Sequence, residues 1–244
     1  MEKELDQLLA WLKTASTYEL PSYSELPHVP LYMEQVTAYV NSILSPINPG
    51  NKDLLTSFMV NNYVKAGIMS APDKKKYSVD QLGYLLALST LKTSLSISEI
   101  ALLIEMDSDV SSDKSVLYGF FRVMAKDILK DVAGKASSKA TGIAEHYQKM
   151  IDANDPDSEK YLRDSLGLIA LRMSIQAGVY QIVSRTILDS IGQKMHGADV
   201  YLEENQPGHK EKRREEKITA AQSKRVALAK KAKLPVKAKD KKEK

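Results

Sequence analysis

The sequence has 244 residues, 43% of them apolar, and a formal net charge of +4. A chain of this length and apolar content can bury a core of its own, in one large domain or two small ones. It contains no cysteine, which excludes a disulfide framework, thiolate metal sites and cysteine nucleophiles and indicates a reducing compartment. We therefore expect a cytoplasmic protein.

The net charge averages two regions of opposite sign. Residues 209–244 hold 15 Lys and Arg against 5 Asp and Glu, a net of +10, which leaves residues 1–208 with a net of −6. Within that acidic part, residues 51–92 hold six lysines against three aspartates, a net of +3. An anion that meets the folded part of the chain should therefore prefer this segment.

The chain starts with an amphipathic helix, to which we assign residues 1–18, and not with the apolar run of a signal sequence. Three prolines between residues 21 and 30 then predict an extended or turning linker. Apolar residues at helical spacing predict the next helix over 31–44. Two prolines and a glycine end it.

A second internal helix is predicted over 53–66, with Gly67 as its C-cap. Two capping signatures follow, S-x-x-Q from Ser78 and S-x-x-E from Ser96. They predict one helix over about 79–92 and another directly after Ser96. Four short helices with a run of three lysines between them would make one compact unit.

Beyond residue 107 the pattern remains helical, first over 117–132 and then in a shorter helix over 143–150. Residues 162–195 carry two apolar stripes, which predict burial on two sides, either inside a helical domain or in a dimer interface. A membrane span is the alternative for this segment. Five polar or charged residues interrupt it: Arg172, Gln176, Gln181, Arg185 and Asp189.

Motifs for catalysis and cofactor binding are missing from the sequence. The four histidines have no metal-ligand spacing, and there is no glycine-rich phosphate loop and no serine nucleophile motif. Residues 152–159 resemble the start of a calcium loop, but they lack its glycine and its final bidentate acid. We expect neither an enzyme nor a bound metal or cofactor.

The helix over 53–66 and the lysine run after it suggest nucleic-acid binding. Asparagine can make two hydrogen bonds to an adenine edge, Ser and Thr suit phosphates or bases, and lysines neutralise the backbone. Charge alone leaves a solvated turn equally plausible. The candidate residues are Thr56, Ser57, Asn61, Asn62, Lys65, Lys74, Lys75 and Lys76.

Several motifs between residues 20 and 105 resemble a known family. They are Leu20-Pro21, L-Y-M-x-Q-V from Leu31, T-x-x-M-x-N-N-Y-V-K from Thr56, and K-K-Y ending at Tyr77. The run from Thr56 to Glu105 looks like the DNA-binding region of the MerR superfamily. Together with the preceding residues 20–41, it is more closely similar to a bacterial family of MerR-like proteins that includes the YkrK-type transcriptional repressors.

This resemblance implies a winged helix-turn-helix in which the helix around Tyr63 enters DNA and the lysine run, ending at Tyr77, forms the wing. It adds both tyrosines to the candidate DNA-binding residues. MerR proteins usually carry an arginine two residues before that first tyrosine, where this chain has Asn61. Lys65 and the wing lysines would then take a larger part in phosphate anchoring.

The expected architecture has four parts. Residues 1–18 form the N-terminal helix and 19–106 a MerR-like winged helix-turn-helix domain. Residues 107–202 form a helical dimerisation or regulatory domain, with no effector assigned. Residues 203–244 form a basic, disordered tail.

The expected function is sequence-specific binding of double-stranded DNA. The protein would act as a transcriptional regulator, a repressor on an inverted repeat, as a homodimer without membrane contact. Two alternatives stay open. One is a helical protein-protein adaptor that uses a helix-turn-helix shape, and the other is a nonspecific nucleic-acid binder acting through its tail.

Overall fold

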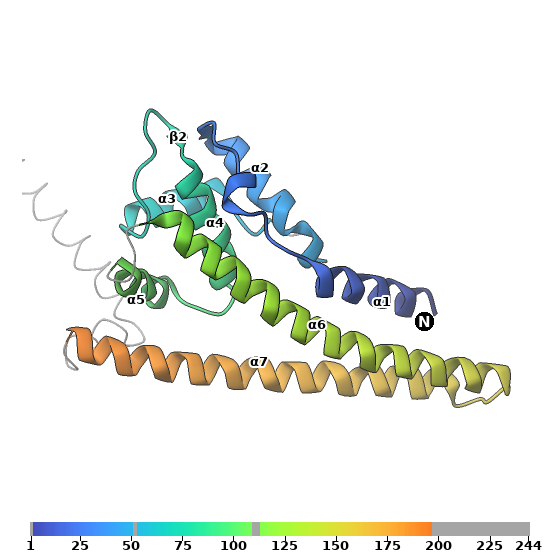
Figure 1. Ribbon diagram of the computed structural model, residues 1–244. Helices are drawn as coiled ribbons and strands as arrows, with labels where there is room; N and C mark the ends of the chain where they lie inside the picture. Colours follow the sequence, from blue (N-terminus) through green and yellow to red (C-terminus); the bar gives the residue numbers. More distant parts are fainter. Residues whose placement is uncertain (1, 51–52, 109–112, 197–244) are drawn as a thin grey trace, which may run out of the picture. The chain divides into compact units, whose positions relative to one another are not determined.

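The computed structural model describes residues 2–50, 53–108 and 113–196, and in these residues the chain is mostly helical (Figure 1). The predicted all-α class is therefore confirmed. Two 3-10 helices, Tyr23–Glu25 and Ser45–Ile47, and a two-stranded sheet of β1 (Leu31–Tyr32) and β2 (Lys76–Tyr77) complete it. The α-helices are α1 (Glu2–Thr17), α2 (Met33–Leu44), α3 (Ser57–Lys65), α4 (Val79–Leu91), α5 (Ile97–Ser108), α6 (Lys114–Asp152) and α7 (Ser158–His196).

The chain divides into two units, Met1–Leu188 and Asp189–Lys244, and every contact reported below lies within the first. The predicted basic tail, residues 203–244, lies outside the described residues.

The starts of α4 and α5 carry the side-chain caps that the S-x-x-Q and S-x-x-E motifs predict. Ser78 accepts a hydrogen bond from the Gln81 amide, and the Gln81 side chain accepts one from the Ser78 amide at 2.9 Å. Ser96 and Glu99 form the same reciprocal pair at the start of α5. Each pair satisfies backbone donors that the first turn of a helix leaves free.

The main core lies between α2, α3, α4 and α5 and continues into the first turns of α6. Tyr118 of α6 is a member of this core, so the core extends past the expected domain boundary at residue 106. α4 and α6 approach closely at Gly83, where a Cβ atom would lie 3.1 Å from the Tyr118 ring. The Tyr118 hydroxyl donates to the Pro21 carbonyl at 2.8 Å, which ties α6 to the linker before α2.

α6 is one continuous helix of 39 residues, where the sequence predicted a helix over 117–132 and a separate shorter one over 143–150. α1 packs along it. The contact uses small side chains, because Ala136 and Ala140 of α6 are buried against Leu12 of α1. Close packing on alanines stabilises a segment that contains few large apolar residues of its own.

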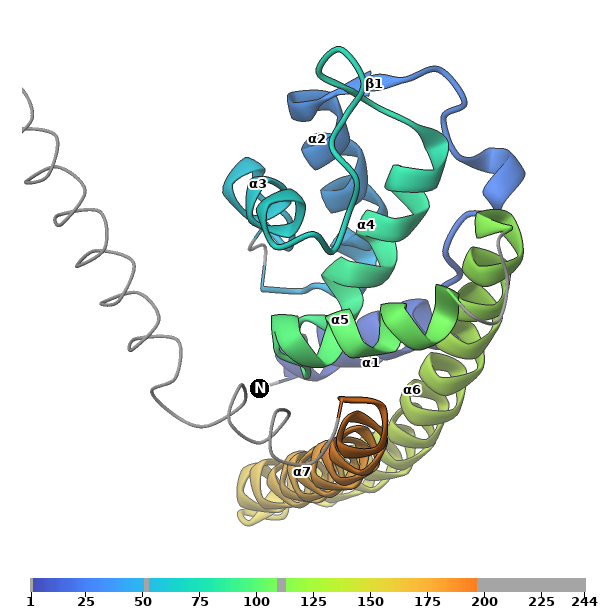
Figure 2. The same cartoon turned by 90° about the vertical axis from the view of Figure 1, so that its left-hand side faces the viewer.

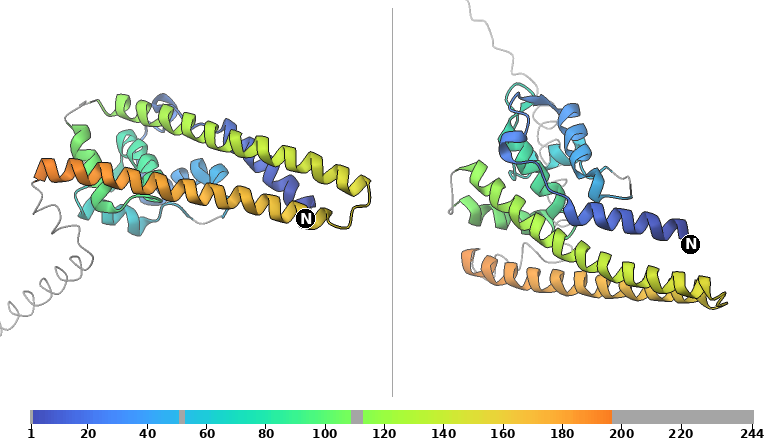
Figure 3. Two further views of the ribbon diagram at one scale, coloured as in Figure 1. Left: turned by 90° about the horizontal axis from the view of Figure 1, so that it is seen from below. Right: turned by 45° about the vertical axis from the view of Figure 1, so that its right-hand side comes forward.

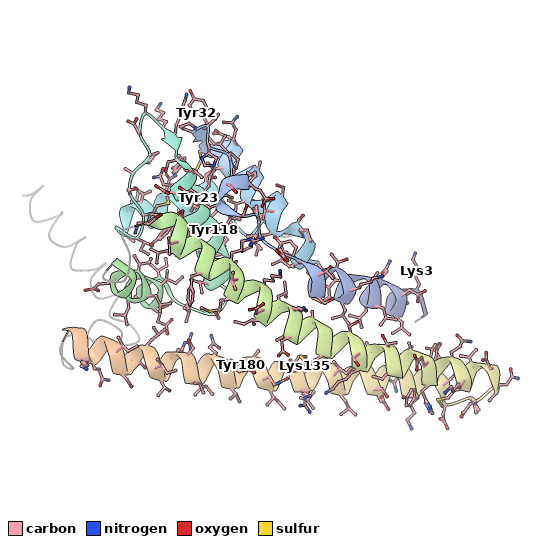
Figure 4. The ribbon with its side chains drawn as sticks, viewed as in Figure 1. Lys3, Tyr23, Tyr32, Tyr118, Lys135 and Tyr180 are labelled. Atoms are coloured by element: carbon pink, nitrogen blue, oxygen red, sulfur yellow. The ribbon has the colours of Figure 1, made fainter. Side chains whose placement is uncertain are left out.

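α7 departs from the burial that its sequence predicts. Its first turns pack against α1 and α6, with Leu162 fully buried beside Leu5 and Tyr147. The stripe predicted to be buried on its second side is exposed instead: Leu168, Leu171, Ile175, Val179 and Ile182. Tyr180, labelled in Figure 4, is 66% exposed. The two-sided burial is therefore not found within a single chain.

α7 is also the one described helix that is long and apolar enough to cross a membrane by length and composition alone, from Ser158 to Lys194. Figure 3 shows it beside α6, to which a short turn joins it. Two polar contacts link its second half to the segment around α5. Gln181 donates to the Ser94 carbonyl at 2.9 Å, and Arg185 pairs with Glu99 at 3.1 Å.

Candidate nucleic-acid interface

α3 is a short helix with one buried and one exposed face. It starts at Ser57, four residues later than predicted, and Thr56 is its N-cap, accepting a hydrogen bond from the Met59 amide. Val60 and Tyr63 face the core. The side chains of Ser57, Asn61 and Lys65 are exposed. Their i, i+4, i+8 spacing puts these three polar groups on one side of the helix.

The later start of α3 has a physical cause in the segment before it. Asn41 of α2 holds both backbone groups of Leu55, donating to its carbonyl at 2.8 Å and accepting from its amide at 2.9 Å. Lys92 donates to the Leu54 carbonyl, and its Nζ also lies 3.0 Å from the sulfur of Met59. Residues 53–56 are therefore held from two sides in a non-helical conformation.

Lys92 is therefore less exposed than the three lysines at residues 74–76. Burial lowers the pKa of its ammonium group, since the charged form loses hydration inside the protein. Its contacts with Leu54 and Met59 instead fix the start of α3 against the end of α4.

Two of the residues assigned to DNA lie in the core. Tyr63 is 3% exposed and Tyr77 is 2% exposed, and burial raises the pKa of both phenols. Tyr63 faces inward because it follows Val60 by three positions on the helix. Tyr77 pairs with Leu31 across the small sheet. In this structure both side chains hold the candidate interface in place and do not form its surface.

The other side chains of α3 that were assigned to DNA differ in how exposed they are and in whether they already make hydrogen bonds. Asn62 is half-buried, and the Thr56 oxygen already serves as a helix cap. Among the described residues, no hydrogen-bond partner is found for the side chains of Asn61 and Asn62. Asn61 therefore offers the most accessible amide on this helix.

The lysine loop, which we define as residues 70–77, contains a tight turn. The Lys76 amide donates to the Asp73 carbonyl at 2.8 Å, with Lys74 and Lys75 between them at φ of 46° and 66°. Two successive positive φ angles are typical of a type I′ turn, which normally contains Asn and Gly. Lysine in the left-handed region is strained. All three lysines are exposed at this turn.

Both ends of the lysine loop are fastened to the core. At the first end, the Gln81 side chain donates to the Ser70 carbonyl at 2.9 Å. At the second end, β2 pairs with β1, opposing Lys76 to Tyr32, and the Lys76 ammonium lies 5.1 Å from the centre of the Tyr32 ring. Figure 2 shows the loop standing beside β1 and next to α3.

Two exposed aromatic residues were missed by the sequence reasoning. Phe58 is 74% exposed on α3, and Tyr32 is 49% exposed beside the lysine loop. Phe58 could have been found, because it falls outside the apolar stripe of its own helix. Tyr32 could not, since its position depends on pairing with residues more than forty positions away.

The structure therefore brings together the exposed face of α3 and an exposed cationic turn on one core. No group of three or more His, Asp or Glu side chains that could hold a metal ion is present in the described part of the chain. The family described as a domain of unknown function (DUF1836) matches residues 21–121. This match covers the linker, α2 to α5 and the start of α6. No curated protein and no solved structure matches the chain.

Proposed function

We propose that the protein is a sequence-specific DNA-binding transcriptional regulator with a winged helix-turn-helix domain, in which α3 enters the major groove and the lysine loop is the wing. The observation that carries the proposal is the exposed row Ser57, Asn61 and Lys65 beside three exposed lysines on a strained turn. The resemblance to MerR-like repressors supports a repressing role.

The side chains on α3 suit the chemistry of a groove. Asn61 can make paired hydrogen bonds with an adenine edge. Lys65 lies one turn further along and can reach a phosphate. Phe58 supplies an apolar contact for a thymine methyl group. The lysine loop would hold the neighbouring sugar-phosphate backbone without reading sequence.

The apolar surface of α7 supports a homodimer. Its exposed stripe, Leu168 to Ile182, advances by three or four residues at each step, as in helices that pack against a second helix. Monomeric proteins rarely leave a continuous apolar surface of this kind in water. A symmetric dimer would present two copies of α3 to an inverted repeat, the usual arrangement for helix-turn-helix proteins.

A bilayer is a poorer partner for the same stripe. Arg185 is paired with Glu99, and Gln181 is bonded to the Ser94 carbonyl. Both contacts attach the second half of α7 to the segment around α5. Inserting α7 into a membrane would break both contacts and would bury Arg172 and Arg185 in hydrocarbon.

Selection of genomic fragments with the purified full chain tests the proposal. We expect enrichment of fragments that share an inverted repeat. In Asn61→Ala, affinity for the selected fragment should fall by about 1–3 kcal/mol while affinity for random duplex stays unchanged. Ser174→Ala, on an exposed position of α7, is the control and should alter neither.

One observation favours a second candidate function, a protein-protein adaptor. Phe58 is a large, exposed apolar side chain on α3, next to Ser57 of the proposed DNA-contacting row, and such residues often anchor protein interfaces. The same selection separates the two functions. An adaptor would enrich no common fragment.

A further inference from the structure

A hollow of about 600 Å³ lies beside the proposed DNA-binding elements. Its walls come from α4, α5 and the first turns of α6, and its floor from residues 68–70 at the start of the lysine loop. We call it the α4–α6 hollow. Its size falls within the range of pockets that bind small molecules, about 300–1,000 Å³.

The lining of the hollow is mostly aromatic and aliphatic. Tyr84, Tyr118, Phe120 and Phe121 contribute rings, and further apolar side chains come from α4 and α5. Flat rings gain from offset or edge-on contacts with such a wall. Met69 and Met124 add flexible thioethers, which adapt to ligands of different outline.

The acidic group of the lining, Asp80, lies at the start of α4. There the Tyr23 hydroxyl donates to Asp80 at 2.5 Å, and Figure 4 shows Tyr23 near Tyr118 of α6. Burial, together with this carboxylate, raises the pKa of Tyr23 to about 12. Lys114 also lines the hollow, and its formal charge is opposite to that of Asp80. Because the lining carries no net formal charge and is mostly apolar, it favours an uncharged ligand.

Two hydrogen bonds connect this lining to the lysine loop and to the end of α3. The Tyr84 hydroxyl donates to the Ile68 carbonyl at 2.9 Å. Gln81 donates to the Ser70 carbonyl at 2.9 Å and also caps α4. A molecule in the hollow would touch the same side chains that fix the backbone of residues 68–70.

We propose that the α4–α6 hollow binds a small, neutral aromatic molecule, and that its occupancy stabilises the lysine loop. The regulatory meaning rests on the proposed function: such a ligand would act as an effector by holding the wing in one arrangement. Binding and stabilisation can both be measured without DNA.

The first experiment uses 1-aminoanthracene, a neutral aromatic amine whose fluorescence rises in apolar sites. We expect saturable binding to the full chain. Ala87→Phe fills the hollow from α4 and should weaken the affinity at least about tenfold. Ala10→Phe, at an exposed position of α1, should leave the affinity unchanged.

A second pair of variants avoids the core, in case the larger side chain at residue 87 disturbs folding. Met124 is 45% exposed at the rim of the hollow, and Ile128 is an equally apolar residue one turn further along α6. Met124→Glu should weaken probe binding, because it places a charge beside a neutral ligand. Ile128→Glu should not. Equal affinities within both pairs, or no binding to the wild type, would overturn the site.

Hydrogen exchange measures the coupling. With probe at ten times its dissociation constant, amides in the lysine loop should exchange about tenfold more slowly if their opening requires ligand release. Unchanged exchange there would overturn the coupling. Probe affinity that falls as the protein concentration rises would show that a second copy occupies the hollow, which also overturns the proposal.

Discussion

Lys74 and Lys75 place two positive charges on a turn whose backbone conformation is unfavourable for lysine. Both residues have positive φ, a conformation that costs lysine free energy and that Asn-Gly adopts readily. Replacing them with Lys74→Asn and Lys75→Gly should raise the free energy of unfolding by about 1 kcal/mol. Urea denaturation measures this change.

The same double variant should bind DNA less well, because it would lose two proposed phosphate contacts, and the negative slope of log affinity against log salt should become shallower by roughly 1.8. A matched variant with Lys74→Gln and Lys75→Gln should lose the same affinity without gaining stability. If the Asn-Gly variant is no more stable than the Gln-Gln variant, the turn is not strained.

The partly buried phenol of Tyr18 should make the free energy of unfolding depend on pH in the alkaline range. Its hydroxyl donates to the Ile43 carbonyl at 2.6 Å, and burial raises its pKa to about 12 from the ordinary value of 10.0. The folded chain therefore binds the phenol proton more tightly than the unfolded chain does. The stability that the protonated Tyr18 contributes to the folded chain is fully present below about pH 10 and is lost as the pH rises towards 12.

Tyr18→Phe should consequently be less stable at pH 8, by about 1 kcal/mol for the lost hydrogen bond, but should lose less stability between pH 9 and pH 11.5. Urea denaturation across this range measures both effects. Parallel stability curves for the two proteins would show that Tyr18 does not titrate as its burial implies.

At the scale of single elements, α7 carries the prediction about assembly. Ile175 lies in the middle of its exposed apolar stripe. We expect the wild-type chain to be a dimer and Ile175→Glu to weaken dimerisation at least about tenfold. Sedimentation equilibrium measures the change, and Ser174→Glu on the flank of the same helix is the control. A monomeric wild type would contradict the assignment of this surface.

Elements defined by neighbouring residues could be predicted from the sequence, and those defined by distant contacts could not. The capping pair Ser78 and Gln81 located the start of α4, because cap and helix lie within four positions. The start of α3 was misplaced, since Leu55 fits a helical pattern but is held by Asn41 of α2. The predicted break in α6 is absent because α1 packs on its alanines.

In the candidate site, too, one part could be predicted from the sequence and another part could not. The charge pattern alone predicted an exposed lysine turn, and the structure exposes all three lysines. Tyr63 and Tyr77 were assigned to DNA by resemblance, yet they serve the core. A motif contains both the residues that make a surface and those that support it. Only packing separates the two.

At the scale of the whole molecule, the charge distribution limits where the proposed DNA contact can form. Residues 1–208 carry a net of −6, while residues 51–92 carry +3. Within residues 1–208, a duplex should therefore be attracted to the segment that contains α3 and the lysine loop and repelled by most of the rest. Removing the lysine loop's charge should then matter more than removing equal charge elsewhere in residues 1–208.

The salt dependence of DNA affinity tests this account most directly. For the full chain and a selected fragment, replacing Lys74, Lys75 and Lys76 with glutamine should make the negative slope of log affinity against log salt shallower by roughly 2.7, at about 0.9 for each phosphate contact. The same replacement at exposed Lys3, Lys13 and Lys149 should leave the slope unchanged. An unaltered slope in the loop variant, or an equal change in both, would contradict the central claim.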